Sequence, residues 1–442
     1  MFQTFKNAWK TPDIRKKLLF TMMIILLYRI GATLYVPYVD VNALSTNLQW
    51  FGSESIFAFV SLISGDAFSK ATLFALSVSP YITASIVMQL LTIAIPALER
   101  LSKQGDEGKK KITAYTRWVT VALALITAYG YVKLLESYNL LTISKTANPT
   151  QYYFGIVVMV ACFCAGAAII MWLAEQINDH GIGNGISMIL FANILSSCNA
   201  MVQSMISMVT TKEGGWIALG IGEVILSLAL TLGAIILIVW FTNSERRIPI
   251  QYAKRVVGRK MYGGQSSNLP LKMNMAGVMP VIFASSIVSI PATIAGFMTK
   301  ENWFTKLVNN WFSYTSPIYI VLFIILIFLF SYFYIMISFN PVEVANNIRS
   351  NGGSVPGIRP GKPTSDYIKK ILNRITTLGA VFLVVIAGVP MIISAVCAAF
   401  EVNFTSIAFT GTSLLIVVGV ALETVRDLEA QLAMRNYKGF LD

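Results

Sequence analysis

Few residues in this chain have the types and spacing that a catalytic or metal site requires. The 442 residues include one histidine, His180, and four cysteines, none at metal-ligand spacing from it. The run Gly-Ile-Gly-Asn-Gly at 181–185 is rich in glycine, but its spacing differs from that of a nucleotide-binding loop. We therefore predict no enzyme activity, no cofactor and no bound metal. The cysteines lie in or at the ends of apolar runs, which favours packed thiols.

Aliphatic side chains instead recur at a spacing that puts them on one helix face. Val78 and Ile82 are four residues apart, as are Ile186 and Leu190, and residues four apart share a face. A ring of aliphatic side chains can close a pore by excluding water, without a charged gate. Ordinary helix packing is the simpler explanation of any single one of these residues. The prediction of a hydrophobic seal therefore rests on the set.

A repeated pattern indicates where such a pore would run. Pro-x-Ile-x-Ala-Ser occurs at residues 80–85 and again at 280–285, each time within a long apolar stretch. Proline and small residues interrupt a hydrophobic helix, and paired interruptions in transport proteins built from repeats indicate the substrate path. Chance recurrence of residues common in membrane helices is the alternative.

Composition places the chain in a membrane. Hydrophobic residues make up 55% of it and charged residues 12%, whereas soluble domains carry about 25% charged residues. About 20 apolar residues cross the hydrocarbon core, and they must be helical because lipid offers the backbone no partners. Ten runs meet this requirement, at roughly 18–37, 71–95, 113–135, 152–173, 183–207, 216–241, 273–298, 317–338, 375–397 and 403–422.

Basic residues predict the orientation of these spans. Of the 34 Lys and Arg, 27 fall in the two terminal segments, in the segments after spans two, six and eight, and, in the case of Arg117, at the start of span three. Basic residues remain cytoplasmic, so we expect a cytoplasmic-membrane protein with both termini inside. The two copies of the repeat then run in opposite directions. The predicted fold is an all-α polytopic membrane protein of ten transmembrane helices in two inverted five-helix halves, 1–209 and 210–442.

Three segments are expected not to span. Residues 56–69 are apolar but too short to cross, which indicates a re-entrant helix or, equally, a surface helix at the membrane interface. Residues 242–272 and 339–374 form long cytoplasmic loops, and loops of this length are often functional. The first alternates around residues 248–252, which predicts a short strand, and the second presents Arg359 at a turn-rich tip.

Polar groups inside the spans are scarce. Arg29 is expected to snorkel to the interface or to pair with a backbone carbonyl. The uncharged polar residues near the repeated pattern could hydrogen-bond between helices, and such bonds average about 0.6 kcal/mol in membranes. A contact of that strength can hold two spans together and still release them. These residues are Gln89, Thr92, Asn184, Asn193, Ser285 and Ser286.

Six motifs of the chain carry a resemblance to a known family, and they are Tyr28–Gly31, Pro80–Ile86, Gly181–Ser187, Arg246–Arg255, Pro356–Gly361 and Gly411–Ile416. They resemble those of the SecY family, the channel subunits of the bacterial Sec protein translocon, and the resemblance runs essentially end to end. It implies a clam-shaped channel whose halves hinge near the connection of spans five and six, with a short re-entrant plug helix.

The resemblance also implies roles for particular residues. The hydrophobic pore ring, here called the aliphatic ring, would comprise Val78, Ile82, Ile186, Leu190, Ile282 and Ile416. Family members often have isoleucine where this chain has Val78 and Leu190. The plug would be formed by Ile63, Ser64, Gly65, Asp66, Ala67 and Phe68. The lateral gate between spans two and seven would involve Gln89, Ser285 and Ser286. Docking of the ribosome and the motor would involve Arg255, Arg259 and Arg359.

The function that the resemblance implies is passive conduction of unfolded secretory polypeptides and lateral release of membrane segments into lipid. Signal sequences and nascent polypeptides would be the cargo, and the partners would be the SecE and SecG subunits, the SecA motor ATPase and the ribosome. Basic loops agree with docking on ribosomal RNA, because Lys and Arg contacts to phosphate give strong, salt-dependent affinity. The positive-inside rule alone would also place basic residues there.

Two other classes of protein remain open from the residues alone. A secondary transporter for a small solute fits ten spans and an inverted repeat, but it would need a polar midplane pocket and charged groups for a coupling ion. A membrane scaffold that only recruits ribosomes explains the basic loops, but it leaves the aliphatic residues and the segment 56–69 without a role.

Overall fold

The computed structural model describes residues 2–40, 43–44, 61, 64–143, 149–210, 217–252, 255–257, 260–262, 266–297, 303–311, 316–399 and 411–438. Each of the ten predicted runs overlaps one long helix. These helices are α2 (Pro12–Gly31), α5 (Ser79–Ala94), α7 (Asp106–Ser137), α8 (Pro149–His180), α9 (Gly185–Thr210), α10 (Ile217–Asn243), α11 (Met279–Phe297), α13 (Pro317–Ser338), α15 (Lys362–Ala399) and α16 (Gly411–Lys438). The fold is a helical membrane-protein fold, as expected.

Among the described residues, five helices are long and apolar enough to cross a bilayer, or six if α5 and α6 (Pro96–Ser102) count as one span. That pair bends by 105°. The bend follows from Pro96, because a proline disfavours the helical conformation of the residue before it, and Ile95 is extended.

The second span begins later than predicted. The apolar run starts at residue 71, but helix α5 begins at Ser79, and residues 73–78 form turns. Ala71 and Ser77 have positive φ values of 46° and 50°. Non-glycine residues adopt this region rarely, so the residue types gave no sign of the turns.

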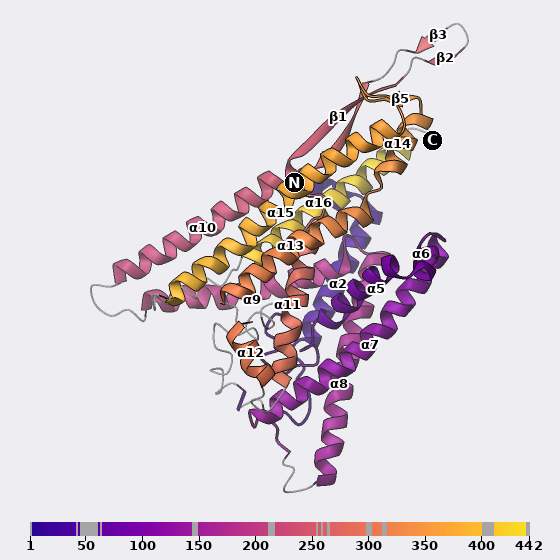
Figure 1. Cartoon of the computed structure of the whole chain (residues 1–442). Coiled ribbons are helices and arrows are strands. Elements are labelled where there is room, and N and C mark those ends of the chain that lie inside the picture. Colours follow the sequence, from indigo (N-terminus) through magenta and orange to yellow (C-terminus); the bar gives the residue numbers. More distant parts are fainter. Residues whose placement is uncertain are drawn as a thin grey trace.

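The helices fall into two groups that meet along α11 (Figure 1). Helices α10, α13, α15 and α16 lie alongside one another, while α5, α7 and α8 lie together on the other side. Helix α11 packs against α13 and also against α5 and α7, and α9 packs against both α10 and α16. The main hydrophobic cluster therefore contains residues from both ends of the chain.

Three short helices accompany the spans. They are α1 (Phe2–Lys10), α12 (Trp303–Trp311) and α14 (Pro341–Ser350). The side chain of Asn340 caps α14 by accepting a hydrogen bond from the backbone N–H of Val342 at 3.1 Å, in the usual manner of an N-cap residue. Helix α12 packs on α11, where Val308 and Ala295 are both buried.

The two long loops join in a small antiparallel sheet of order β4-β1-β5. Strand β1 (Glu245–Tyr252) pairs with β4 (Ser266–Lys272) in the register Ile248 to Leu269, and its other edge pairs with β5 (Gly353–Ser354). A second hairpin consists of β2 (Arg255–Val257) and β3 (Lys260–Tyr262). The predicted strand at residues 248–252 is confirmed, and its buried Ile248 and Ile250 pack on α14 and α15 residues.

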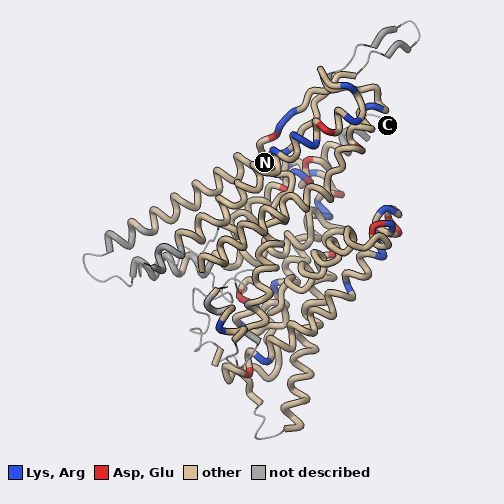
Figure 2. Tube along the Cα trace, in the orientation of Figure 1, with Lys and Arg blue, Asp and Glu red and all other residues tan. Residues whose placement is uncertain are grey.

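Charged residues are distributed unevenly along the molecule (Figure 2). They gather at the end that carries the N-terminus, the sheet of β1, β4 and β5, and helix α6, whereas the long middle portion of the helices is largely free of them. This distribution is the one expected of a protein whose central layer contacts lipid hydrocarbon.

Candidate functional site

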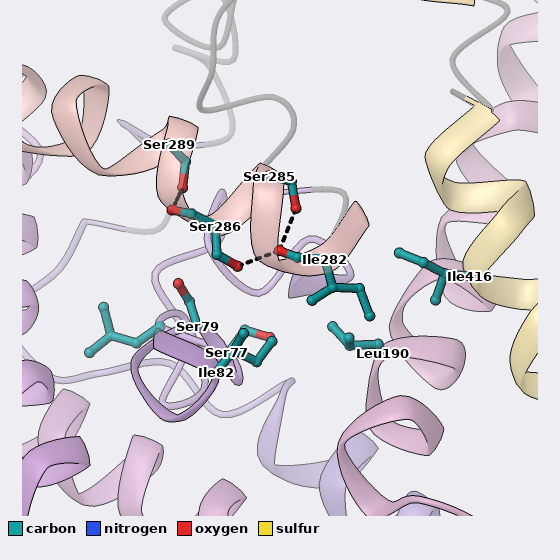
Figure 3. A pocket seen from close by; sticks show the side chains of 10 residues that line it. Ser77, Ser79, Ile82, Leu190, Ile282, Ser285, Ser286, Ser289 and Ile416 are labelled. Atoms are coloured by element: carbon teal, nitrogen blue, oxygen red, sulfur yellow. Dashed lines mark hydrogen bonds between the residues drawn. The ribbon is translucent and has the colours of Figure 1, made fainter. Parts of the chain in front are cut away.

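A small cavity lies where the two copies of the repeated pattern approach each other (Figure 3). Its volume is about 50 Å³. Its walls come from four helices, α5, α9, α11 and α16, and from the turn before α5. The lining residues are Leu76, Ser77, Ser79, Ile82, Leu190, Ile282, Ser285, Ser286, Ser289 and Ile416.

Four of the six predicted ring residues line this cavity. Ile282, Leu190 and Ile416 point toward one another from α11, α9 and α16, and Ile82 lies on α5 (Figure 3). Each of the four is at most 5% exposed. The structure therefore brings together, from four separate helices, aliphatic residues that are up to 334 positions apart in the chain, counted from Ile82 to Ile416.

The other two ring candidates lie close by but do not line the cavity. Val78 is buried in the same hydrophobic cluster as the four lining residues, and Ile186 is partly buried and packs against that cluster. Ile186 lies one helical turn from Leu190 on α9, as their spacing predicts.

The cavity is small. A water molecule needs at least about 10–15 Å³ on the same measure, so a volume of about 50 Å³ holds only a few waters.

Serine hydroxyls form the polar part of the cavity wall, and those of the three serines on α11 bond within that helix. Ser285 and Ser286 both donate to the backbone carbonyl of Ile282, at 2.9 and 2.8 Å. Gln89 donates to Ser85 at 3.4 Å on the same helix, about two turns beyond Ile82 and outside the cavity lining. The expectation that these three side chains would hydrogen-bond between helices is therefore wrong, because each finds a partner within its own helix.

Asn193 does make such a contact between elements. Its amide donates to the hydroxyl of Ser77 at 3.4 Å and so joins α9 to the turn before α5. Both residues are buried, and Ser77 lines the cavity.

The predicted plug segment is described over residues 64–69, and Ile63 lies outside the described residues. Ser61 and Ser64 are helical, and residues 65–69 form turns. Gly65 and Asp66 have φ values of 62° and 66°, and a backbone in this left-handed region cannot continue a right-handed helix. The hydroxyl of Ser64 closes the turn by accepting a hydrogen bond from the backbone N–H of Phe68 at 3.1 Å. We call residues 64–68 the plug turn.

Arg29 lies beside the plug turn. Its guanidinium donates to the backbone carbonyls of Ala192 and Asn193 on α9, which confirms that it pairs with backbone carbonyls. A Cβ atom added to Gly65 would lie 3.1 Å from Nη1 of Arg29 and 2.9 Å from Oγ of Ser196. The plug turn is thus packed closely against α2 and α9.

Sequence reasoning missed Tyr131 on α7. Its hydroxyl donates to the backbone carbonyl of Phe68 at 2.5 Å, and the two rings lie 4.6 Å apart, centroid to centroid. Tyr131 is fully buried and also contacts the ring of Phe163. The sequence did offer one signal, a tyrosine within an apolar run. A buried tyrosine hydroxyl usually has a hydrogen-bond partner, so such a residue predicts a polar contact inside the protein.

Two of the three predicted docking residues, Arg255 and Arg359, belong to segments at the charged end of the molecule. Arg359 is exposed between Gly357 and Gly361, whose φ values of 79° and 103° shape the turn. The backbone of Arg255 lies in β2, but nothing of its side chain is described, and Arg259 lies outside the described residues. Strand β5 joins the loop of Arg359 to the sheet that contains β1.

Comparison with known proteins identifies relatives of the whole chain. The family model described as SecY matches residues 72–425. The protein translocase subunit SecY of Streptomyces galbus is 45% identical over 446 aligned positions that include 100% of both chains. A corresponding subunit of Mycobacterium tuberculosis strain H37Rv is 42% identical, again over 100% of both.

Solved structures share the fold. A structure described as a protein conducting channel has a TM-score of 0.62 at 18% identity and covers 94% of this chain and 92% of its own. A second structure has the same TM-score of 0.62 at 18% identity and also covers 94% of this chain and 92% of its own. Its description states that the plug domain of SecY stabilises the closed state of the translocation channel and maintains a membrane seal. Sec61 in a canine ribosome-channel complex from the endoplasmic reticulum scores 0.60 at 18% identity, covering 94% and 92%.

Proposed function

The chain belongs to the SecY family of protein translocase subunits, and on that basis we propose that it is the polypeptide-conducting subunit of a membrane channel. Unfolded secretory polypeptides would cross between the predicted halves 1–209 and 210–442, through the position of the cavity. The aliphatic ring would then seal the path when it is empty, and it would fit closely around a polypeptide that passes through. Because aliphatic side chains make no directional bonds, one ring can fit many kinds of side chain.

The observation that carries this proposal is the convergence of Ile82, Leu190, Ile282 and Ile416 on one small cavity. Ile82 and Ile282 occupy the same position in the two copies of the repeated pattern. A repeat that lines one path with equivalent residues is expected of a transport protein. The cavity is lined only by aliphatic residues and serines, which suits a seal that excludes ions and water.

The same lining weighs against a secondary transporter for a small solute. Such a transporter requires charged groups near its central site to carry a coupling ion. No charged side chain lines this cavity in the part of the chain that the structure describes.

A lateral exit is proposed between α5 and α11, which contact each other next to the cavity. The side chains of Gln89, Ser285 and Ser286 bond within their own helices, so separating α5 from α11 breaks none of their hydrogen bonds. An apolar signal sequence could then partition between these two helices toward lipid, and membrane segments would leave by the same route.

We propose further that the charged end faces the cytoplasm and docks the ribosome and a motor ATPase, with both termini on that side. Support comes from the basic residues gathered there (Figure 2) and from exposed Arg359 on its turn. The canine relative is described in complex with a ribosome, which favours the same partner here. SecE and SecG are proposed as the accompanying subunits and SecA as the motor.

Transport itself tests the proposal. The complex would be reconstituted in vesicles with its motor, and uptake of a secretory precursor would be compared with uptake of small solutes. We expect protected precursor that depends on a signal sequence, and no solute accumulation driven by an ion gradient. Gradient-driven solute uptake without precursor transport would overturn the proposal and favour the transporter.

A further inference from the structure

The plug turn is held at two points by side chains outside it. Arg29 of α2 and Ser196 of α9 border Gly65, and Tyr131 of α7 hydrogen-bonds to Phe68. These contacts tie a turn of five residues to three separate helices. They go beyond the contacts expected of a segment that merely rests in a hydrophobic pocket.

The fit at Gly65 is close enough to be specific. Its φ of 62° is one that residues with a Cβ rarely adopt, and an added Cβ would lie 2.9 Å from Ser196 and 3.1 Å from Arg29. The guanidinium itself is fixed by the two carbonyls of α9, so it forms a rigid surface under the turn. Its positive charge also attracts the carboxylate of Asp66.

The contact between Tyr131 and Phe68 is well buried. Tyr131 and Phe68 are at most 5% exposed, and the ring contact and the hydrogen bond act between the same two residues. A hydrogen bond shielded from water is lost only when the turn moves as a unit away from α7. The contact therefore acts on the position of the plug turn as well as on its internal shape.

The plug turn is connected to the aliphatic ring through shared packing and hydrogen bonds. Ala67 is buried in the same hydrophobic cluster as Val78, Ile82 and Ile282. Asn193, whose carbonyl accepts from Arg29, donates to Ser77 in the cavity wall.

We propose that Arg29 and Tyr131 are positioning residues that clamp the plug turn in the closed channel and so set how readily the plug leaves the pore. The inference rests on the proposed function and specifies which side chains hold the closed state. Opening breaks the contact of Tyr131 with Phe68 and lifts Gly65 off Arg29, while Arg29 stays bound to α9.

The test measures exposure of the plug turn directly. In the full complex with its native cysteines replaced, a cysteine is placed at Ala67, which is 1% exposed, and its rate of labelling by a small thiol reagent is followed. Tyr131→Phe removes the hydroxyl and keeps the ring. Because one hydrogen bond contributes about 1 kcal/mol, we expect labelling to rise about five- to tenfold. Arg29→Gln and Gly65→Ala should raise it at least as much.

Two controls separate a clamp from general loosening. Tyr129→Phe alters an exposed tyrosine of the same helix and should leave labelling at position 67 unchanged. A cysteine at Ala174, fully buried in α8, should stay unreactive in every variant. Equal labelling at both sites in the Tyr131→Phe protein would overturn the proposal, as would unchanged labelling at position 67 in all three clamp variants. Failure of the proposed function shows separately, as absence of precursor transport by the unsubstituted channel.

Discussion

Replacing Ile282 by asparagine should open the closed channel to water. Ile282 is 5% exposed, and burial of an isoleucine side chain contributes about 1.5–3 kcal/mol. An amide buried in its place costs a further 1–3 kcal/mol or so unless it finds hydrogen-bond partners. In an open, hydrated pore the amide carries no such cost. Together, the two contributions weaken the closed state by about 2.5–6 kcal/mol relative to the open state.

The cavity shows how this cost is relieved. Its volume of about 50 Å³ accommodates a few waters, and the aliphatic walls of the ring give them few partners. An asparagine beside Ser285 and Ser286 would supply those partners. We expect the cavity to fill with water, and the seal by exclusion of water to fail.

The assay is ion leak through vesicles that contain the complex without cargo. A change of about 2.5–6 kcal/mol corresponds to roughly a 70- to 25,000-fold shift between closed and open states, so leak should rise at least tenfold. Precursors with weak signal sequences should also cross more readily. Ile282→Leu, which keeps the aliphatic character, and Ile294→Asn, on the exposed face of α11, should behave like the unsubstituted protein. Equal leak from the asparagine variants at 282 and 294 would refute the reasoning.

Two further predictions concern charged residues. Arg117 forms a two-pronged ion pair with Glu175, at 3.0 and 2.7 Å, and Glu175 is buried. Arg117→Met leaves that carboxylate without its cation and should destabilise the protein by about 1–3 kcal/mol, less than for a fully buried pair because Arg117 is half exposed. Thermal unfolding measures this loss, and Lys103→Met, which breaks an exposed pair, should cost under about 0.5 kcal/mol. Arg359→Ala should weaken ribosome binding and lower the salt dependence of its affinity by roughly one charge, whereas Lys306→Ala at the other end should not; equal effects would contradict docking at Arg359.

The sequence predicted the spans well because membrane insertion imposes a local requirement. Every run of about 20 apolar residues must form a helix, and the ten predicted runs each overlap one. Their ends were less predictable. Helix α16 extends to Lys438, well past the apolar run, because its polar continuation remains helical outside the apolar layer.

Contacts between segments that are far apart in the chain could not be predicted from local sequence patterns. Strand β5 pairs with β1 across about 100 positions, and neither sequence indicates the other. Tyr131 and the plug turn likewise come together only through the packing of α7. The ring candidates could be identified because a repeated pattern and helical spacing marked them, although only the structure shows which four line the cavity.

Site-specific crosslinking tests the central claim most directly. A photoreactive residue would be placed at Ile82 and, separately, at Ile282, with Leu232 on the exposed face of α10 as the control, and a secretory precursor would be stalled midway across the membrane. A polypeptide-conducting path at the cavity predicts crosslinks to the mature part of the precursor from both ring positions and none from the control. Silence at both ring positions while the precursor still crosses would contradict the account and place the path elsewhere.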